Sequence, residues 1–325
     1  MSWLKAALAA GLCTVTAVSA QTAPGQAYPS KSVRFIVPYP PGGATDIISR
    51  AIGTKLGASL GQQFLIDNRA GGGQKIGTAI AAKAPADGYT ILLVSVTHSI
   101  NPGLDPKLPY DSVKDFAPVT LVASSPNVVV LHPSVPASSV KELIALAKAH
   151  PGKLNLATSG NGSGGHLAGA LFQSVAGVRM TTVPYKGGAP AYVDLMGGQV
   201  EVMFTSPNPT LSYAKAGKLR AIAMTGAKRS PAAPELPTIA EAAGLPGYEA
   251  SLWYGIMLPA STPREIVQLL HGEITKAVQA RDVREPLAAF AVEVIASTPE
   301  EFAAHLRKET DKWAKVIRDA NIRAD

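Results

Sequence analysis

The amino-acid sequence predicts an α/β protein of two domains, each built on a mainly parallel central sheet flanked by helices. Short apolar runs of strand length alternate with segments of helical periodicity, which is typical of βαβ units. The 325 residues favour more than one domain, and a hydrophobic content of 46% excludes a mostly disordered chain. Glycine-rich stretches follow several apolar runs, where a strand of a parallel sheet gives way to a helix.

The first domain begins with the buried-strand pattern of Val33–Val37, which Pro38 closes. The next segment places Ile48, Ile52 and Leu56 on one face at helical spacing, which predicts a helix. The expected elements in chain order are a strand at 33–37, a helix at 46–60, a strand at 64–66, a helix at 76–84 and a strand at 90–94.

Two apolar runs on either side of Pro126, at 119–123 and 128–131, predict strands at which the chain crosses into the second domain. There the alternation restarts, with a helix from 140, a strand at 155–157, a helix from 167, a strand at 181–183, a helix at 191–196, a strand at 200–204, a helix at 210–216 and a strand at 219–224. The Pro- and Ala-rich stretch 226–247 predicts a return connection, and the remainder is expected to be mostly helical. Capping-box patterns mark three helix starts, namely Ser139 with Glu142, Thr262 with Glu265, and Thr298 with Glu301.

An export signal is predicted over residues 1–20. Lys5 precedes an apolar stretch at 6–18, which is too short to cross a bilayer. The stretch ends in a small-x-small pattern that predicts cleavage after Ala20; the alternative is a retained anchor. Cys13, the single cysteine, lies inside this segment, so the mature chain would have no disulfide, thiolate metal site or cysteine nucleophile. We therefore expect a soluble protein exported to the periplasm.

The formal net charge of +7 raises the question of a nucleic-acid partner. The basic residues are dispersed, however, and the longest basic adjacencies are pairs such as Lys228–Arg229 and Arg307–Lys308. A polyanion-binding surface needs a clustered basic patch. We therefore expect no nucleic-acid partner, and a weak field that favours small anions.

The feature that carries chemistry is a set of glycine-rich junctions between predicted strands and helices. At such a junction the unpaired N–H groups of a helix N-terminus point outward, and glycine lets an anion approach the main chain closely. Tight turns alone are the alternative for any one junction, whereas several junctions spread over two domains favour an anion-binding cleft. The junctions are residues 40–46, 69–75, 159–166 and 185–190.

Catalytic and cofactor patterns are not supported by the sequence. Gly160, Gly162 and Gly165 match the dinucleotide fingerprint, but the acidic residue expected at the end of the next strand is replaced by Tyr185 and Lys186. The stretch 71–76 lacks the length and the hydroxyl residue of a phosphate-binding loop, and the six histidines show no metal-ligand spacing. Ser159, Ser163 and Ser206 do not fit the Gly-x-Ser-x-Gly pattern of a nucleophile elbow. We therefore expect no catalytic residue, cofactor or metal.

Several polar side chains are candidates for ligand contact at the predicted cleft. His98 and His166 would sit at the carboxyl edges of the sheets, either as surface or capping residues or as donors to an anionic or carbonyl oxygen. Lys186 could pair with a carboxylate or remain solvated. Tyr39, Tyr185, Trp253 and Tyr254 could form a cleft wall or fill the core, and the polar run 205–208 suits neutral hydrogen bonding.

Six motifs together span nearly all of the mature chain, at residues 28–38, 41–46, 68–73, 84–90, 183–188 and 235–242. In these motifs the chain resembles the Bug (TctC-like) family of extracytoplasmic receptors of tripartite tricarboxylate transporters. The resemblance implies a type II periplasmic-binding-protein fold with a crossing-strand hinge. Its two lobes would comprise residues 21–124 plus 248–325, and residues 125–247.

The resemblance also implies which residues hold the ligand. In the family, the loop after the first strand binds one carboxylate through main-chain N–H groups, and loops of the second lobe grip the remainder. Carried onto this sequence, the expected ligand-binding residues are Tyr39, Gly43, Ala44, Thr45, Asp46, Ser95, Thr97, His98, Ser159, Asn161, Gly162, Ser163, His166, Tyr185, Lys186, Ala189, Thr205 and Asn208. Many members carry an aspartate where Thr205 stands, so the resemblance argues against an amino-acid ligand.

The expected ligand is a small carboxylate whose distal group is neutral or a second carboxylate, such as citrate or terephthalate, with a dicarboxylate preferred. The resemblance implies delivery of this ligand by a monomeric receptor to the integral-membrane permease subunits of the transporter, without catalysis. Two alternatives remain from the residues alone: a periplasmic ligand sensor for a two-component system, and a secreted hydrolase.

Overall fold

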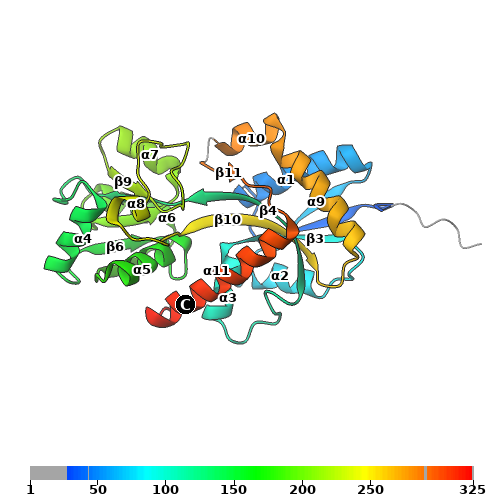
Figure 1. Cartoon of the computed structure of the whole chain (residues 1–325), viewed down its shortest axis with the longest axis horizontal. Coiled ribbons are helices and arrows are strands. Elements are labelled where there is room, and N and C mark those ends of the chain that lie inside the picture. Colours follow the sequence, from blue (N-terminus) through cyan, green and yellow to red (C-terminus); the bar gives the residue numbers. More distant parts are fainter. Residues whose placement is uncertain (1–27, 43, 289–290, 324–325) are drawn as a thin grey trace, which may run out of the picture.

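The computed structural model describes residues 28–42, 44–288 and 291–323, which form two lobes joined by long strands (Figure 1). Lobe 1 is the part built on a six-stranded sheet of strand order β11-β4-β10-β3-β1-β2. Its strands are β1 (Val33–Val37), β2 (Phe64–Asn68), β3 (Thr90–Ser95), β4 (Phe116–Pro126), β10 (Ser251–Pro259) and β11 (Glu293–Val294). Its helices are α1 (Ala44–Leu60), α2 (Lys75–Ala82), α3 (Val96–Leu104), α9 (Arg264–Gln279), α10 (Arg281–Ala288) and α11 (Pro299–Asp319).

Lobe 2 is the part built on a five-stranded sheet of order β7-β6-β8-β5-β9. Its strands are β5 (Val128–Leu131), β6 (Asn155–Thr158), β7 (Thr181–Pro184), β8 (Val202–Thr205) and β9 (Arg220–Met224). Its helices are α4 (Val140–Ala149), α5 (Gly164–Ala176), α6 (Gly188–Met196), α7 (Pro207–Lys215) and α8 (Ile239–Ala243).

Both sheets are buried on two faces, which explains why their strands read as continuous apolar runs rather than alternating ones. In lobe 1, Phe35 packs with Ile48 and Ile52 of α1 on one face, while Ile36 belongs to the core on the face covered by α2, α3 and α11. That second core continues without a break into lobe 2, where Phe172 of α5 belongs to it. The two lobes therefore share one apolar core on the side of the hinge that α11 covers.

The predicted α/β class is confirmed, but the sheets are mixed rather than mainly parallel. β1, β2 and β3 are parallel to one another, as are β6, β7 and β8. β4, β10 and β11 join the first sheet antiparallel, and β5 and β9 join the second antiparallel. Apart from the pair of β11 with β4, every antiparallel pair involves β10 or β5, the strands with which the chain enters a sheet from the other lobe.

β10 corrects the expectation that the chain beyond residue 247 is mostly helical. It pairs antiparallel with β4 from Ser251 to Pro259, and the two strands run side by side from lobe to lobe (Figure 1). The aromatic and aliphatic run from Leu252 to Leu258 has strand length and composition, which is the signal that predicts it. Helix α3 was likewise not expected, and it begins directly after β3 at Val96.

The hinge is held by a closed set of hydrogen bonds where the chain changes lobe. Asn127, between β4 and β5, donates its N–H to Thr225 Oγ1 (2.7 Å) and accepts from the Thr225 N–H (2.9 Å). Thr225 Oγ1 donates to the carbonyl of Ala250 (2.7 Å), whose N–H donates back to the Thr225 carbonyl (3.0 Å). All three residues are buried, so the two crossing segments are tied together without competition from water.

Helix α11 is fastened to the hinge strand by a buried carboxylate. Glu309 Oε2 accepts from the indole N–H of Trp253 on β10 (3.1 Å) and from that of Trp313 (2.9 Å), and its other oxygen pairs with Lys312. Lys312 also donates to the carbonyl of Glu249 (3.1 Å), just before β10. Every partner of this buried charge is therefore supplied by α11 itself or by the returning hinge segment. Within the described ranges, no helix is long and apolar enough to span a bilayer.

Candidate functional site

A cavity of about 410 Å³ lies between the lobes, at the carboxyl ends of β1 and β3. Lobe 1 supplies most of the wall, and Gly164 at the start of α5 supplies the part from lobe 2. The described residues that line it are Tyr39, Pro40, Pro41, Thr45, Ser95, Val96, Thr97, Gly164, Leu252 and Tyr254. None of these residues is charged, so a charged ligand in this cavity must be held by main-chain or neutral side-chain groups.

Within the described chain, the first turns of three helices meet at this cavity. Thr45 is the second residue of α1, Val96 and Thr97 open α3, and Gly164 opens α5. The N–H groups of a first turn have no partner within their own helix, and they carry the positive end of the helix dipole. The cavity is therefore electropositive without a cationic side chain, which is the environment that a small anion requires.

The loop before α1 is held in place by Asp46, which is buried. Its carboxylate accepts from the N–H of Gly42 (3.0 Å), from Arg50 Nε (2.9 Å) and from Asn68 Nδ2 (3.0 Å). The hydrogen bond from Arg50, together with those from Gly42 and Asn68, lowers the pKa of Asp46 to about 2. The side chain of this predicted ligand-binding residue is thus occupied by protein partners. Its contribution to a ligand would come from the main chain, as the resemblance implies.

Tyr39, Ser95 and Thr97 form the neutral polar wall of the cavity. The hydroxyls of Tyr39 and Ser95 are hydrogen-bonded to each other, and Ser95 Oγ also accepts from the Thr97 N–H (3.3 Å) as the N-cap of α3. Burial raises the pKa of Tyr39 above its ordinary value, and burial does the same for Tyr254. Both phenols therefore stay protonated and neutral at physiological pH.

The glycine-rich loop of lobe 2 is shaped by its own polar residues. Ser163 caps α5 by accepting from the His166 N–H (3.3 Å), and His166 Nδ1 accepts from the Gly162 N–H (3.1 Å). An ideal Cβ on Gly164 would lie 2.5 Å from Leu252 Cδ2 of β10, so a larger residue at this contact between the lobes would force the Leu252 side chain to move. His166 is buried and helps to set the loop shape from which α5 presents its first turn.

The next loop of lobe 2 is fastened to the first. The Gly187 N–H donates to the Ser159 carbonyl (3.2 Å), and the Tyr185 hydroxyl donates to Asp194 Oδ2 of α6 (2.6 Å). Burial and the Asp194 carboxylate raise the pKa of Tyr185 to about 12. The exposed members of the predicted set in lobe 2 are Ser159, Asn161, Lys186, Ala189 and Asn208. Thr205 is nearly buried at the end of β8, where its hydroxyl is hydrogen-bonded to Tyr192 (2.7 Å).

His98 does not reach the cavity, which corrects its place among the predicted ligand-binding residues. Its ring is buried against Tyr110 and Phe116, at centroid distances of 6.0 and 5.1 Å, and Nε2 is hydrogen-bonded to the Ser112 carbonyl (2.8 Å). Burial lowers the pKa of His98 to about 4, so the ring is neutral. The third residue of a helix points its side chain back toward the core here, and the sequence did not predict that helix.

Gly43 and the predicted export signal lie outside the described residues, and Ala44 is described only as the first residue of α1. Leu252 lines the cavity but was not predicted, because the strand that carries it was not. The apolar run around it is the signal that would have found it. Among the described side chains, no group of three or more His, Cys, Asp or Glu could hold a metal ion.

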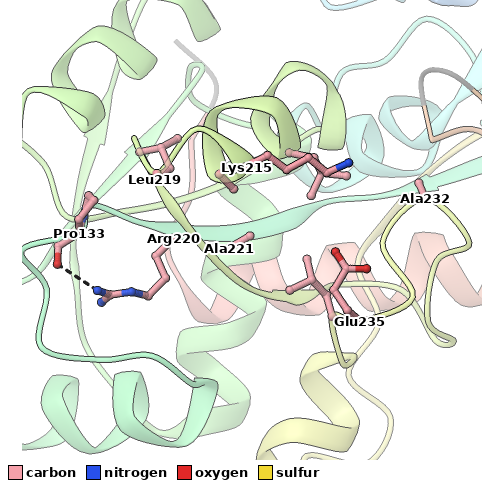
Figure 2. Close-up of a pocket in the computed structure, with 11 residues that line it drawn as sticks. Pro133, Lys215, Leu219, Arg220, Ala221, Ala232 and Glu235 are labelled. Atoms are coloured by element: carbon pink, nitrogen blue, oxygen red, sulfur yellow. Dashed lines mark hydrogen bonds between the residues drawn. The ribbon is translucent and has the colours of Figure 1, made fainter.

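Another hollow, of about 460 Å³, lies in lobe 2 alone, between α7, β9 and the loop before α8. Figure 2 shows Arg220 turned toward Pro133; its guanidinium donates to the carbonyls of Pro133 (3.2 Å), Val135 (2.9 Å) and Ala137 (2.9 Å). These hydrogen bonds hold the guanidinium against the loop between β5 and α4. Since neither the other lobe nor a helix N-terminus contributes, this hollow is a poor candidate for anion capture.

Comparison with known proteins places this geometry in a family. Residues 48–322 match the family described as tripartite tricarboxylate transporter family receptor. Protein BugT of Bordetella pertussis is 38% identical over 315 residues, which are 96% of each chain. A solved R. palustris protein with adipate is 36% identical with a TM-score of 0.74, over 91% of this chain and 99% of that one. MatC from Rhodopseudomonas palustris with bound malate is 31% identical with a TM-score of 0.72, over 89% and 100%.

These similarities confirm the two-lobed periplasmic-binding-protein fold. The family match covers far more than half of the chain, and BugT matches it nearly from end to end. The chain therefore belongs to the TctC/Bug family of tripartite tricarboxylate transporter receptors, which are binding proteins and not enzymes.

Proposed function

We propose that this protein captures a small carboxylate between its lobes in the periplasm and delivers it, as a monomer, to the permease subunits of a tripartite tricarboxylate-type transporter. The observation that carries the proposal is the convergence, among the described residues, of the first turns of α1, α3 and α5 on one uncharged cavity. The ligand carboxylate would lie on the amides of α1, at Thr45 and its neighbours.

Domain closure supplies the affinity in this mechanism. The carboxylate first binds the amides of lobe 1, and lobe 2 then closes and removes water, which strengthens each hydrogen bond. Closure requires that the closed form bind the anion better than the open form does. The hinge hydrogen bonds of Asn127, Thr225 and Ala250 support this, because they keep the crossing strands together while the lobes change their angle.

Within the carboxylates, we propose a di- or tricarboxylate or an aromatic dicarboxylate such as terephthalate. Two similar proteins were solved with adipate and with malate, both dicarboxylates, and this supports the class. A second anionic group would lie on the first turn of α5 at Gly164, which faces the cavity from lobe 2. The side chain of His98 takes no part, because it is buried in lobe 1.

The decisive experiment is a thermal-shift and calorimetric screen of the mature protein. The panel contains succinate, malate, adipate, citrate and terephthalate, with benzoate and hexanoate as monocarboxylates and putrescine as a cation. A ligand at 100 times its dissociation constant adds about 2.7 kcal/mol of stability, which a melting curve resolves. A dissociation constant in the micromolar range for a carboxylate supports the proposal, and the absence of binding by every carboxylate overturns it.

The role in transport needs a separate test, because a ligand sensor would bind equally well. Deletion of the gene should abolish uptake of the radiolabelled ligand by cells while leaving transcriptional responses to it intact. Loss of the response with normal uptake would favour the sensor. N-terminal sequencing of the protein from a periplasmic extract should find Gln21 first, as cleavage after Ala20 requires.

A further inference from the structure

Behind the end of β8, three hydroxyl groups form a hydrogen-bonded chain that leads from Thr205 into lobe 2. Thr205 Oγ1 lies 2.7 Å from the Tyr192 hydroxyl of α6, and that hydroxyl lies 2.5 Å from Thr210 Oγ1 of α7. Thr210 Oγ1 in turn donates to the Ser206 carbonyl (2.7 Å). Thr210 is fully buried and Thr205 is 9% exposed, so the chain runs from the edge of the sheet into the core.

The directions of the protons along this chain follow from counting donors. A hydroxyl carries one proton, and a carbonyl oxygen can only accept. Because Thr210 gives its proton to the Ser206 carbonyl, the contact between Thr210 and Tyr192 must use the proton of Tyr192. Tyr192 then has no proton left, so Thr205 must donate to it. Thr205 Oγ1 is left with acceptor capacity only.

Thr205 lies beside the start of α5, the element through which lobe 2 reaches the cavity. It directly follows Phe204, whose carbonyl is so close to α5 that an ideal Cβ on Gly165 would lie 2.1 Å from it. Gly164, the residue before, lines the cavity. Thr205 is outside the cavity lining in this structure, but as the last residue of β8 it lies at the carboxyl edge of the lobe 2 sheet, beside the first turn of α5. In the proposed closure of lobe 2, this edge would approach the part of the ligand farthest from α1.

We infer that Tyr192 is a positioning residue that fixes Thr205 as a hydrogen-bond acceptor, so that the ligand group meeting Thr205 is a donor such as a hydroxyl or an amide N–H. The inference rests on the proposed function and narrows it. The ligand is a carboxylate that carries a hydroxyl or amide at the end facing Thr205, whether or not a second carboxylate lies elsewhere. A carboxylate oxygen at Thr205 would meet the lone pairs of Thr205 Oγ1 and would receive no hydrogen bond from it.

Removing the Tyr192 hydroxyl tests the polarity directly. In Tyr192→Phe the proton of Thr205 loses its partner and becomes available to a ligand, whereas Thr210 keeps its bond to the Ser206 carbonyl. Hydrogen bonds to charged groups are stronger than those between neutral groups. The variant should therefore gain affinity for ligands with an acceptor at this end, relative to those with a donor.

The experiment measures dissociation constants by calorimetry for two probe pairs: adipate against 6-hydroxyhexanoate, and terephthalate against 4-(hydroxymethyl)benzoate. The readout is the ratio of the constant for the dicarboxylate to that for the hydroxy acid. In Tyr192→Phe this ratio should fall at least tenfold. In Thr205→Val the hydroxy acid should lose about tenfold in affinity, while the dicarboxylate changes less than threefold. Tyr213→Phe is the matched control, because its ring packs 5.7 Å from that of Tyr192 but its hydroxyl is outside the chain, and the ratio should stay within twofold.

A ratio that stays within twofold in Tyr192→Phe overturns the inference and leaves the proposed function standing. Equal losses for both members of a pair in Thr205→Val overturn it as well, because Thr205 would then act by packing alone. If no probe and no carboxylate of the wider panel binds the wild-type protein, the proposed function itself fails. That result is distinct, since it appears before any variant is made.

Discussion

Replacing Thr45 with proline removes one main-chain donor from the proposed carboxylate site and keeps the helix. Proline is tolerated in the first turn of a helix, where its missing N–H has no intrahelical partner. Thr45 lines the cavity and is 6% exposed, so its N–H is shielded from bulk water. A charge-assisted hydrogen bond to the ligand is worth about 1.5–3 kcal/mol, which predicts a dissociation constant roughly 10- to 150-fold weaker.

The assay is isothermal titration of the tightest ligand from the carboxylate panel into wild type and Thr45→Pro. Lys141→Pro is the matched control, because it stands at the same second position of helix α4 and outside the cavity lining. Its N-cap Ser139 accepts from the Glu142 N–H, so the substitution leaves the cap intact. The control should bind as the wild type does. A folded Thr45→Pro protein with unchanged affinity would show that the first turn of α1 does not hold the anion.

Three further predictions concern stability. Glu309→Gln should lower the free energy of unfolding by about 3 kcal/mol in urea titrations, because Lys312 is left without its buried counter-charge. A loss under 1 kcal/mol would show that the Glu309 carboxylate does not stabilise the contact between α11 and β10. The pKa of His98 is about 4 in the folded protein and ~6.5 in the unfolded chain. Keeping this ring neutral therefore contributes about 3 kcal/mol to the free energy of unfolding above pH 6.5, and this contribution is lost as the pH falls toward 4. His98→Gln should weaken the pH dependence of stability in this range. Gly165→Ala should destabilise by about 1–3 kcal/mol through its clash with Phe204, whereas Gly272→Ala, with open space, should not.

The parts of the fold that were predictable are those in which local pattern and tertiary role agree. Residues 33–37 form the predicted strand because both faces of that strand are buried. Thr298 and Glu301 form the predicted capping box, since both halves are local to one helix turn. The glycine-rich junctions do lie at the carboxyl ends of the parallel strands, because the βαβ connection leaves no other edge for them.

The parts that were not predictable depend on partners distant in sequence. Thr262 does not cap α9; its hydroxyl donates instead to the Pro259 carbonyl of β10, a strand the pattern did not indicate. His98 reads as an edge residue until α3 and the later residues Tyr110 and Phe116 enclose it. The polarity of Thr205 is set by residues on two other helices, so no local spacing could have revealed it.

The neutral lining of the interlobe cavity has a consequence for uptake in acidic surroundings. Its two phenols, Tyr39 and Tyr254, remain uncharged at physiological pH, and the nearby carboxylate of Asp46 stays ionised down to about pH 2. Among the described residues that line the cavity, none therefore changes its charge between pH 4 and 8. If the protein binds a carboxylate as proposed, acidification acts at this lining by protonating the ligand and not the protein. The pH at which binding weakens would then follow the pKa of the ligand.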